Sequence, residues 1–412
     1  MSIFNMTANK PDVEFALDSS DKSTIVLTVK HADLAIINSL RRTALADLTN
    51  VGFYFNPNEH HDTPTTNVIQ NDTPLHNELI MHRLSLIPIH MTKEEIMNWN
   101  PDAYEFIIDV TNQSGFRTDI TTEHIRVRNI ENETYLDENI VRKWFPRDAY
   151  TKDYILITKL NSNLSSRIHI VAKAIIGTAS KCVSFGVLSR FSVEFIVDEN
   201  LSKKNCKKLF EQHQKEKSVF VDMKTDEYEN TEDWKKFKKH FDSLERERCY
   251  SKNRYLEPNW FKITIDSECA IQPKDIFTDS IHTLKENLVE QLELAQNTNL
   301  EIMNTDSLMS IVIPSSTHTI GNLVQSTVYN TAIRLDRTQD SNNDRLLSHK
   351  LTYVGYNIPH PLDSILLFKF KGDKVMTLDD ARQCYIDMLE TTLSEINKYQ
   401  NKWNTFSSNI NT

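Results

Sequence analysis

Glycine, cysteine and long apolar runs are all scarce in this chain of 412 residues. Only seven glycines occur, so each one marks a position where backbone geometry or close packing matters. No apolar run approaches the roughly 20 residues needed to cross a bilayer. The first residues, MSIFNMTANKPDVEF, also lack a charged-then-apolar signal pattern. These absences predict an intracellular protein with no membrane partner.

The few cysteines argue against metal and disulfide chemistry. No two of the five have metal-ligand spacing, and they are spread over the sequence as Cys182, Cys206, Cys249, Cys269 and Cys384. We expect reduced, mostly buried thiols, no bound metal and no other cofactor.

Motifs for phosphate binding or catalysis are also missing. There is neither a G-x-x-x-x-G-K-[ST] loop nor a G-x-G-x-x-G segment. His60 and His61 lie in a polar stretch without a third ligand, so exposure is favoured over metal binding. His76 and His82 miss the H-E-x-x-H spacing. We therefore expect no catalytic residues, with a free-standing metal hydrolase as an alternative.

The charge balance limits the partners. A net charge of −10 argues against a chain that mainly binds nucleic acid. Range 198–257 contains KKNCKK and WKKFKKHF, but acidic residues are interleaved among the lysines. We interpret it as a helical insertion with a solvated or partner-binding surface, and contact of its lysines with nucleic acid is the less favoured alternative.

A strand followed by a helix occurs near both ends of the chain. The alternating run 23–29 predicts a strand, and 31–48 predicts a helix with Asp33 as its cap. The later run LMSIVIP predicts a strand, with a helix from about Thr317. Asn38 and Asn322 each lie nine positions after the end of the preceding strand. Both units later add a strand and a long amphipathic helix.

Such a unit cannot cover all of its apolar helix surface by itself. We therefore predict an α+β fold in which two strand-helix units pair about a pseudo-twofold axis, with an inserted, mostly-β domain in the first half. Two unrelated α+β domains with coincidental spacing are the alternative. The residues expected to pair the halves are Leu34, Ile37, Leu40, Ile281, Leu284, Leu288, Ile320, Gly321, Asn322, Leu323, Tyr385 and Met388.

The same patterns divide the chain into domains. The expected boundaries are 1–52 plus 189–296 for the first dimerisation domain (with the charged insertion 198–257), 53–188 for the inserted β-rich domain, 297–306 for a linker, and 307–412 for the second dimerisation domain.

Several segments resemble the assembly subunits of multisubunit RNA polymerases. NSLRR (38–42), HNELIMHRLSLIPI (76–89) and KITIDSECAIQPKDIFTDSIHTLKENL (262–288) resemble the α-like family, which includes the bacterial α and archaeal D-type proteins. HTIGNL (318–323) and YVGYNIPHPL (353–362) resemble the smaller partner, the archaeal L-type protein and its eukaryotic equivalent. The resemblance implies that a heterodimer normally made of two chains is here one polypeptide, as in large DNA viruses of eukaryotes.

The resemblance also implies a function. The chain would be a non-catalytic assembly subunit of DNA-dependent RNA polymerase, present once per enzyme, that scaffolds the two largest catalytic subunits and meets small polymerase subunits. Asn38, Arg41, Arg42, His82 and Arg83 would be partner-binding residues. For Arg41 and Arg42, the alternative is that they lie on a solvated helix face. For His82 and Arg83, the alternative is a structural pair whose hydrogen bonds are satisfied within the chain.

The chain departs from the resembled pattern in its inserted domain, which lacks the cysteine cluster that binds zinc or an iron–sulfur cluster in many relatives. We expect no direct sequence-specific contact with nucleic acid. A viral source would place the protein in the viral factory cytoplasm and virion, and any other source in the nucleus. A structural virion protein is a further alternative.

Overall fold

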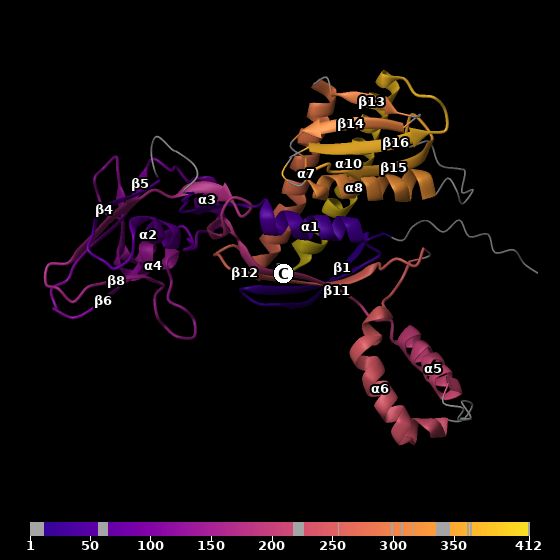
Figure 1. Cartoon of the computed structure of the whole chain (residues 1–412), viewed down its shortest axis with the longest axis horizontal. Coiled ribbons are helices and arrows are strands. Elements are labelled where there is room, and N and C mark those ends of the chain that lie inside the picture. Colours follow the sequence, from indigo (N-terminus) through magenta and orange to yellow (C-terminus); the bar gives the residue numbers. More distant parts are fainter. Residues whose placement is uncertain are drawn as a thin grey trace, which may run out of the picture.

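The computed structural model describes most of the chain as strands and helices arranged in distinct lobes (Figure 1). The α+β class expected from the sequence is confirmed by this mixture of sheets and helices. The described residues are 12–56, 65–216, 226–253, 255–297, 300–305, 308–314, 316–334, 347–360, 362 and 365–410.

The first sheet is antiparallel and has the strand order β1-β2-β12-β11. Its strands are β1 (Glu14–Ser20), β2 (Thr24–Lys30), β11 (Leu188–Phe195) and β12 (Trp260–Ser267). Side chains along β2 alternate between buried and half-buried, with Ile25, Leu27 and Val29 inside. That period of two is what a sheet with one covered face requires. Strand β1 was not predicted, because its residues are mostly polar and exposed.

The second sheet repeats this order, as β13-β14-β16-β15. Its strands are β13 (Ile302–Thr305), β14 (Leu308–Pro314), β15 (Leu351–Asn357) and β16 (Ile365–Gly372). In each sheet a hairpin comes first, and the last strand lies between the second and the third. Strand β13 falls in the range 297–306 that was expected to be a linker. Its pairing with β14, in which Ile302 faces Ile311, satisfies the backbone groups of this segment.

Four helices lie between the two sheets (Figure 1). They are α1 (Leu34–Ala46), α7 (Pro273–Asn297), α8 (His318–Val328), which continues into a π-helical turn (Tyr329–Ile333), and α10 (Leu378–Asn409). Helix α1 contacts α7 and α8, and α10 contacts the same two helices. One continuous hydrophobic cluster includes all four. Burying a Leu or Ile stabilises by about 1.5–3 kcal/mol, so this layer dominates the packing between the sheets.

The chain between α1 and β11 forms a second lobe, at the left of Figure 1. Its sheet has the order β4-β9-β5-β7, and the pairs β6-β8 and β3-β10 accompany it. Its aromatic core includes Phe53, Trp99, Phe106, Trp144 and Phe145. The elements are β3 (Thr49–Gly52), β4 (Thr66–Asn71), α2 (Asn77–Leu84), α3 (Lys93–Met97), β5 (Tyr104–Thr111), β6 (Thr118–Thr121), η1 (Thr122–His124), β7 (Ile125–Asn129), α4 (Glu138–Trp144), β8 (Leu156–Leu160), β9 (Arg167–Ala172), β10 (Ile175–Thr178) and η2 (Val183–Phe185).

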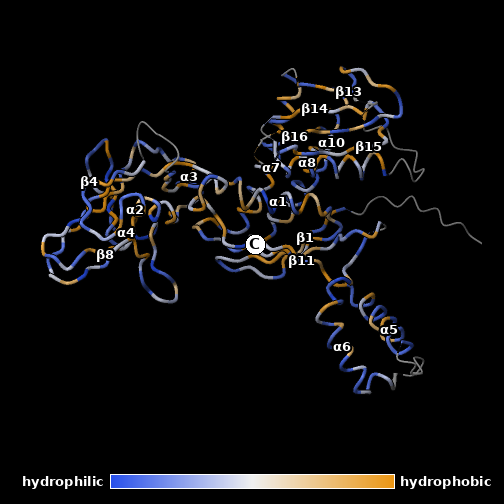
Figure 2. The backbone as a smooth tube through the Cα atoms, in the orientation of Figure 1, coloured by the Kyte–Doolittle hydropathy of each residue, from blue (hydrophilic) through white to orange (hydrophobic). Residues whose placement is uncertain are grey.

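A helical hairpin projects from the first sheet, at the bottom of Figure 1. It consists of α5 (Glu199–Glu216), η3 (Asp226–Asn230), α6 (Glu232–Leu244) and η4 (Arg246–Arg248), inserted between β11 and β12. Hydrophobic and hydrophilic residues alternate along both helices (Figure 2). The hairpin has its own hydrophobic cluster, separate from the main one.

Candidate protein-assembly surface

Asp33 joins three helices at the start of α1. Its side chain caps α1 by accepting a hydrogen bond from the Ala35 backbone N–H at 2.8 Å. The other carboxylate oxygen accepts from Asn330 Nδ2 at 2.9 Å, in the π-helical turn after α8. The backbone N–H of Asp33 donates to Tyr399 Oη of α10 at 2.7 Å. The sequence identified Asp33 as a cap but could not show that it connects segments more than 290 positions apart.

Arg42 makes a contact within the chain. Its Nε donates to Thr319 Oγ1 at 2.8 Å, so α1 is fastened to the first turn of α8. The Thr319 side chain is buried, whereas Arg42 is exposed. Next to them, burial raises the pKa of Tyr356, and the positive charge of Arg42 opposes that rise. The Nε of Arg42 is thus used within the chain, and the contact with a large catalytic subunit that the resemblance implies stays a prediction.

Arg41 and Asn38 form a pair on α1. Arg41 Nε donates to Asn38 Oδ1 at 3.1 Å, one helical turn away, and both side chains are half-buried. The side-chain carbonyl oxygen of Asn38 is therefore used within α1, by Arg41. Its counterpart Asn322 on α8 is also half-buried.

Most of the residues expected to pair the halves are buried between the sheets. Two are exceptions: Asn322 is half-buried, and Leu34 occupies the exposed first position of α1 with 38% of its surface accessible. The neighbouring Ala35 and Ile36 are buried in its place. The buried members are Ile37, Leu40, Ile281, Leu284, Leu288, Ile320, Gly321, Leu323, Tyr385 and Met388.

Gly321 allows a close approach, but within its own unit. A Cβ at this position would lie 2.6 Å from Leu366 Cδ1 and 2.7 Å from Tyr356 Cδ2, which belong to β16 and β15. Any larger residue would push α8 away from the second sheet. These contacts lie within its own unit, and the expectation that Gly321 helps to pair the two halves stays a prediction.

The end of α10 supplies a contact that the sequence analysis missed. Trp403 is fully buried against Phe15 of β1 and Phe277 of α7, with ring centroids 5.4 and 4.5 Å away. Its Nε1 donates to Thr278 Oγ1 at 2.8 Å. Helix α10 runs to Asn409, and Trp403 continues the spacing of Ile396 and Tyr399 along the same face. That periodicity was a signal that could have found it.

The other end of α10 holds the end of α7. Arg382 Nε and Nη2 donate to the backbone oxygens of Ala295 and Gln296, each at 2.9 Å. These are terminal carbonyls of α7, which have no partner inside the helix. A basic side chain at this position also complements the negative end of the helix dipole.

His82 and Arg83 lie on α2, in the other lobe from α1 (Figure 1). Both side chains are exposed. Arg83 Nη2 donates to the Leu156 backbone oxygen of β8 at 2.8 Å, which ties α2 to a neighbouring strand. The exposed face of this segment also carries Leu79 and Leu86, each 46% accessible.

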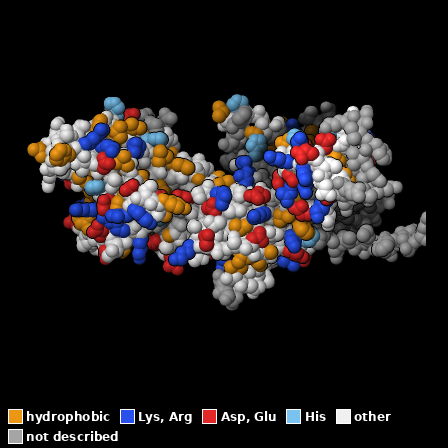
Figure 3. Space-filling model, turned by 90° about the horizontal axis from the view of Figure 1, so that it is seen from below, with side chains coloured by type: hydrophobic (Ala, Val, Ile, Leu, Met, Phe, Trp, Pro, Cys, Tyr) orange, Lys and Arg blue, Asp and Glu red, His pale blue; other side chains and the backbone are white. Residues whose placement is uncertain are grey.

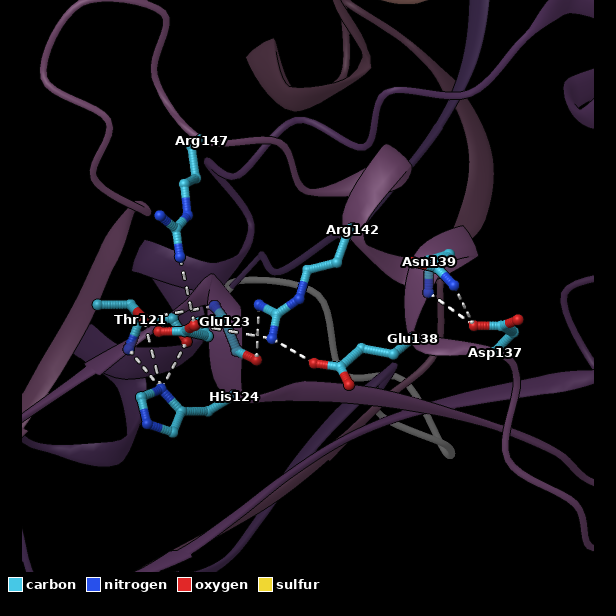
Figure 4. A network of polar contacts seen from close by, with 8 residues as sticks. All are labelled: Thr121, Glu123, His124, Asp137, Glu138, Asn139, Arg142 and Arg147. Carbon is cyan, nitrogen blue, oxygen red and sulfur yellow. Dashed lines mark hydrogen bonds and ion pairs between the residues drawn. The ribbon is translucent and has the colours of Figure 1, made fainter.

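A polar network ties α4 to η1 in the same lobe (Figure 4). Arg142 lies 2.5 Å from Glu138 Oε1 and 3.7 Å from Glu123 Oε1, and Arg147 lies 3.8 Å from the same Glu123 atom. His124 Nδ1 lies within hydrogen-bond distance of the backbone of Thr121, three residues earlier in the chain. These side chains hold surface elements together and present no arranged nucleophile or base.

The buried thiols are unsuited to nucleophilic chemistry. Burial raises the pKa of Cys206 and Cys269 to about 11 and that of Cys384 to about 12, so all three are protonated at neutral pH. Across the described ranges, no group of three His, Cys, Asp or Glu side chains is placed to hold a metal ion. His60 and His61, for which a metal was considered, lie outside the described residues. No described helix is long and apolar enough to span a bilayer.

Comparison with known proteins gives one family and one weak relative. The family model of the RNA polymerase Rpb3/Rpb11 dimerisation domain matches residues 26–288, from β2 to α7. A conjugation stage-specific protein of Tetrahymena thermophila is 25% identical over 199 residues, which is 44% of this chain. The chain spans 60% of the length of that relative.

Proposed function

Because this chain belongs to the RNA polymerase Rpb3/Rpb11 dimerisation-domain family, we propose that it scaffolds the two largest subunits of a DNA-dependent RNA polymerase. It contributes no catalytic residue. One copy enters each enzyme, and small polymerase subunits are further partners. The helix layer between the two sheets is the observation that carries this proposal, since a dimerisation domain needs a partner to cover its helices.

In this proposal both dimerisation partners are fused in one chain. The family match ends at residue 288, so the second unit rests on other support. That support is its strand order, which repeats the order of the first sheet, and the packing of α8 and α10 against α1 and α7. The proposed units are 1–52 plus 189–296 and 307–412, paired about a pseudo-twofold axis. Range 53–188 is an insertion into the first unit.

The surface proposed for the large subunits includes α1 and α2. Helix α1 offers the exposed Arg42 with Leu34 and Leu45, which are 38% and 37% accessible. Helix α2 offers His82 and Arg83 beside exposed leucines. A surface that combines arginine with apolar side chains suits a protein partner.

The proposed location follows from the proposed activity, because an assembly subunit works where transcription occurs. That place is the nucleus, or the viral factory cytoplasm and the virion if the source is a large DNA virus. The glycine-poor composition, with seven glycines in 412 residues, motivates the viral proposal.

The proposal is tested by affinity purification of the tagged chain from its source, followed by identification of the recovered proteins. We expect both largest polymerase subunits in near-equal amounts with the tagged chain. Arg41→Glu combined with Arg42→Glu should reduce their recovery at least about tenfold, because a buried or half-buried contact with a reversed charge costs several kcal/mol. Recovery without polymerase subunits, or normal recovery by the double variant, would contradict the proposal.

Two controls separate this surface from simple unfolding. Lys22→Glu combined with Arg117→Glu reverses the same number of charges at exposed positions elsewhere. Thr319→Val removes only the hydrogen bond from Arg42 within the chain. Both controls should recover the polymerase subunits normally.

A further inference from the structure

The two four-stranded sheets differ on their outer faces, which point away from the helix layer. On the outer face of the first sheet, the central strands β2 and β12 pair Thr28 with Lys262. On that of the second, β14 and β16 pair Val312 with Leu367. Thr28 and Val312 each precede the last buried residue of their strand, so the two pairs are equivalent. The same place is therefore polar in one sheet and apolar in the other.

The outer face of the first sheet supplies partners for its own polar groups. Arg190 Nε lies 2.7 Å from Asp266 Oδ2 on the neighbouring strand. Thr28 Oγ1 donates a hydrogen bond to Asp18 Oδ2 at 2.9 Å. Figure 3, which views the molecule from below, shows Lys and Arg side chains interspersed with Asp and Glu over its middle part. A face with charges of both signs in contact has no strong preference for one kind of partner.

The outer face of the second sheet carries an apolar patch. Ile365 of β16 and Met303 of β13 are 39% and 40% accessible, and Val312 and Leu367 are half-buried between them. None of the four belongs to the hydrophobic cluster of the helix layer, because alternation along the strands turns them to the other side. Apolar side chains gathered at the surface mark a place where another molecule packs.

An aromatic ring lies flat beside this patch. A Cβ on Gly355 would lie 2.5 Å from Tyr353 Oη and 3.1 Å from Tyr353 Cζ, so the ring runs along β15 over the Gly355 backbone. The missing side chain at Gly355 makes room for the ring, which remains 49% accessible. Tyr353 pairs with Lys371 and Gly355 with Lys369, so this ring lies next to both lysines. Tyrosine offers an apolar surface with a polar end, which suits a protein interface.

The charge on this face indicates the chemistry of its partner. Lys369 and Lys371 form no ion pair with a residue that the structure describes. Glu301, which precedes β13, is separated from them by β14, and Asp373 and Lys374 after β16 have opposite charges. Two neighbouring lysines without a carboxylate beside them are complementary to an acidic group on another molecule.

We propose that the outer face of the second sheet binds a segment of another protein in which apolar side chains are flanked by Asp or Glu. The apolar side chains cover Ile365, Leu367 and the ring of Tyr353. The carboxylates pair with Lys369 and Lys371. A protein is favoured over a lipid surface because the half-buried side chains lie within the surface of the sheet and do not project into a bilayer.

This inference goes beyond the proposed function and does not rest on it. The large polymerase subunits are proposed to contact α1 and α2, whereas this surface belongs to β13, β14, β15 and β16 of the second unit. It gives the second unit a partner of its own.

The first experiment identifies the bound segment by photo-crosslinking. Ile365 is replaced by p-benzoylphenylalanine in the tagged full-length chain, which is irradiated in its source, purified and analysed by mass spectrometry. We expect a crosslink to a segment of another protein that combines apolar residues with Asp or Glu. Trp260, which occupies the equivalent position of the first sheet, is the control site and should not crosslink to that segment.

Three crosslinking results would overturn the proposal. They are the absence of a protein crosslink from position 365, a crosslinked segment without acidic residues, and a crosslink to a second copy of this chain.

The second experiment measures affinity, with a fluorescently labelled synthetic copy of the crosslinked segment as the probe. Its binding to the purified full-length chain is followed by anisotropy. Val312→Thr combined with Leu367→Thr should weaken binding at least about tenfold, because two apolar contacts are lost and threonine suits a strand. The matched control is Val26→Thr combined with Lys262→Thr, on the outer face of the first sheet, and should bind normally. Equal losses in variant and control would overturn the proposal.

The lysines are tested separately. Lys369→Gln combined with Lys371→Gln should weaken binding about fivefold at low salt, and the difference from the wild type should disappear near about 1 M salt. Unchanged affinity would remove the acidic partner from the proposal and overturn it. Cosedimentation with phosphatidylserine vesicles provides the last check. Vesicle binding that the lysine variant loses would assign this face to an anionic membrane and overturn the protein partner.

These results can be told apart from those on the proposed function. Peptide binding is measured on the isolated chain, so it can succeed even where the recovery of polymerase subunits fails. Loss of peptide binding by the Val312 and Leu367 variant, with normal recovery of the large subunits, would support a separate surface.

Discussion

The two sheet-helix units have the same strand order but differ in what they carry between the shared elements. In the first unit, a whole lobe follows α1 and a helical hairpin separates β11 from β12. In the second, β15 and β16 are joined by a short connection. Both units keep the strands of their sheet and the helices that pack between the two sheets. The added lobe and the helical hairpin lie outside this helix layer (Figure 1). The comparison indicates that pairing constrains the shared elements and leaves the periphery free to acquire new contacts.

The largest expected effect comes from the side chain that links α10 to the first sheet. Trp403→Ala should lower the free energy of unfolding by about 3–5 kcal/mol, because it opens a large cavity among Phe15, Phe277 and Phe406. Urea denaturation followed by circular dichroism measures the loss. Trp144→Ala is the matched control in the other lobe, where Trp144 is also buried and hydrogen-bonded, to Glu95.

Both tryptophan variants should be destabilised, but only Trp403→Ala should weaken the contact between the two units. A change below about 1 kcal/mol for Trp403→Ala would show that α10 does not depend on this contact.

A smaller effect is expected at the glycine that distinguishes α8 from α1. Gly321→Ala should cost about 1–3 kcal/mol, since the added methyl group overlaps Leu366 and the Tyr356 ring. The equivalent position on α1, one residue before Asn38, holds the fully buried Ile37, so the two helices approach their sheets differently. Thermal denaturation provides the measurement. Ser326→Ala on the same helix serves as the control and should be neutral, and equal stability of the two variants would refute the account of Gly321.

The hydrogen bond between Asp33 and Tyr399 should contribute about 0.5–1.5 kcal/mol. Tyr399→Phe keeps the ring but leaves the backbone N–H of Asp33 without its acceptor. Tyr385→Phe is the control, because the hydroxyl of this buried tyrosine makes no hydrogen bond to a described residue. Urea denaturation measures the free energy of unfolding of both variants. An equal loss for Tyr399→Phe and Tyr385→Phe would contradict a stabilising role for the hydrogen bond to Asp33.

The smallest effect concerns acid stability. Burial lowers the pKa of His90 below its ordinary value of 6.5, against the opposing charge of Glu268. Between 6.5 and the lower folded pKa, the unfolded chain binds more protons than the folded one, so stability falls as the pH drops through this window. His90→Gln should therefore lose less stability than the wild type between neutral and mildly acidic pH. The exposed His240→Gln should follow the wild type, and identical pH profiles for all three proteins would contradict this assignment.

Local patterns were sufficient to predict most of the elements that the two units share. Alternation identified β2 and β14, and helical spacing identified α1, α7, α8 and α10, because burial of one face imposes a period on the sequence. Strands β1 and β13 were missed, since β1 is mostly polar and exposed and β13 is only four residues long, so neither shows a clear side-chain pattern.

The polar contacts between the units could not be predicted either. Arg42 meets Thr319, and Asp33 meets Tyr399 and Asn330, across long separations that only the packed structure defines. Scarcity of glycine marked Gly321 as a position where close packing matters, but only the fold shows that β15 and β16 approach it. Sequence therefore indicated which residues are constrained, and the fold showed which partners constrain them.

Cleavage of the connection between the units tests the pairing most directly. A protease site placed between Asn297 and Leu300 lies after α7 and before β13, so no described strand or helix is cut. We predict that the two fragments elute together on a sizing column without denaturant, because the helix layer and the Arg382 contacts with the end of α7 remain. Elution of two separate folded fragments would contradict the pairing of the two units within one chain.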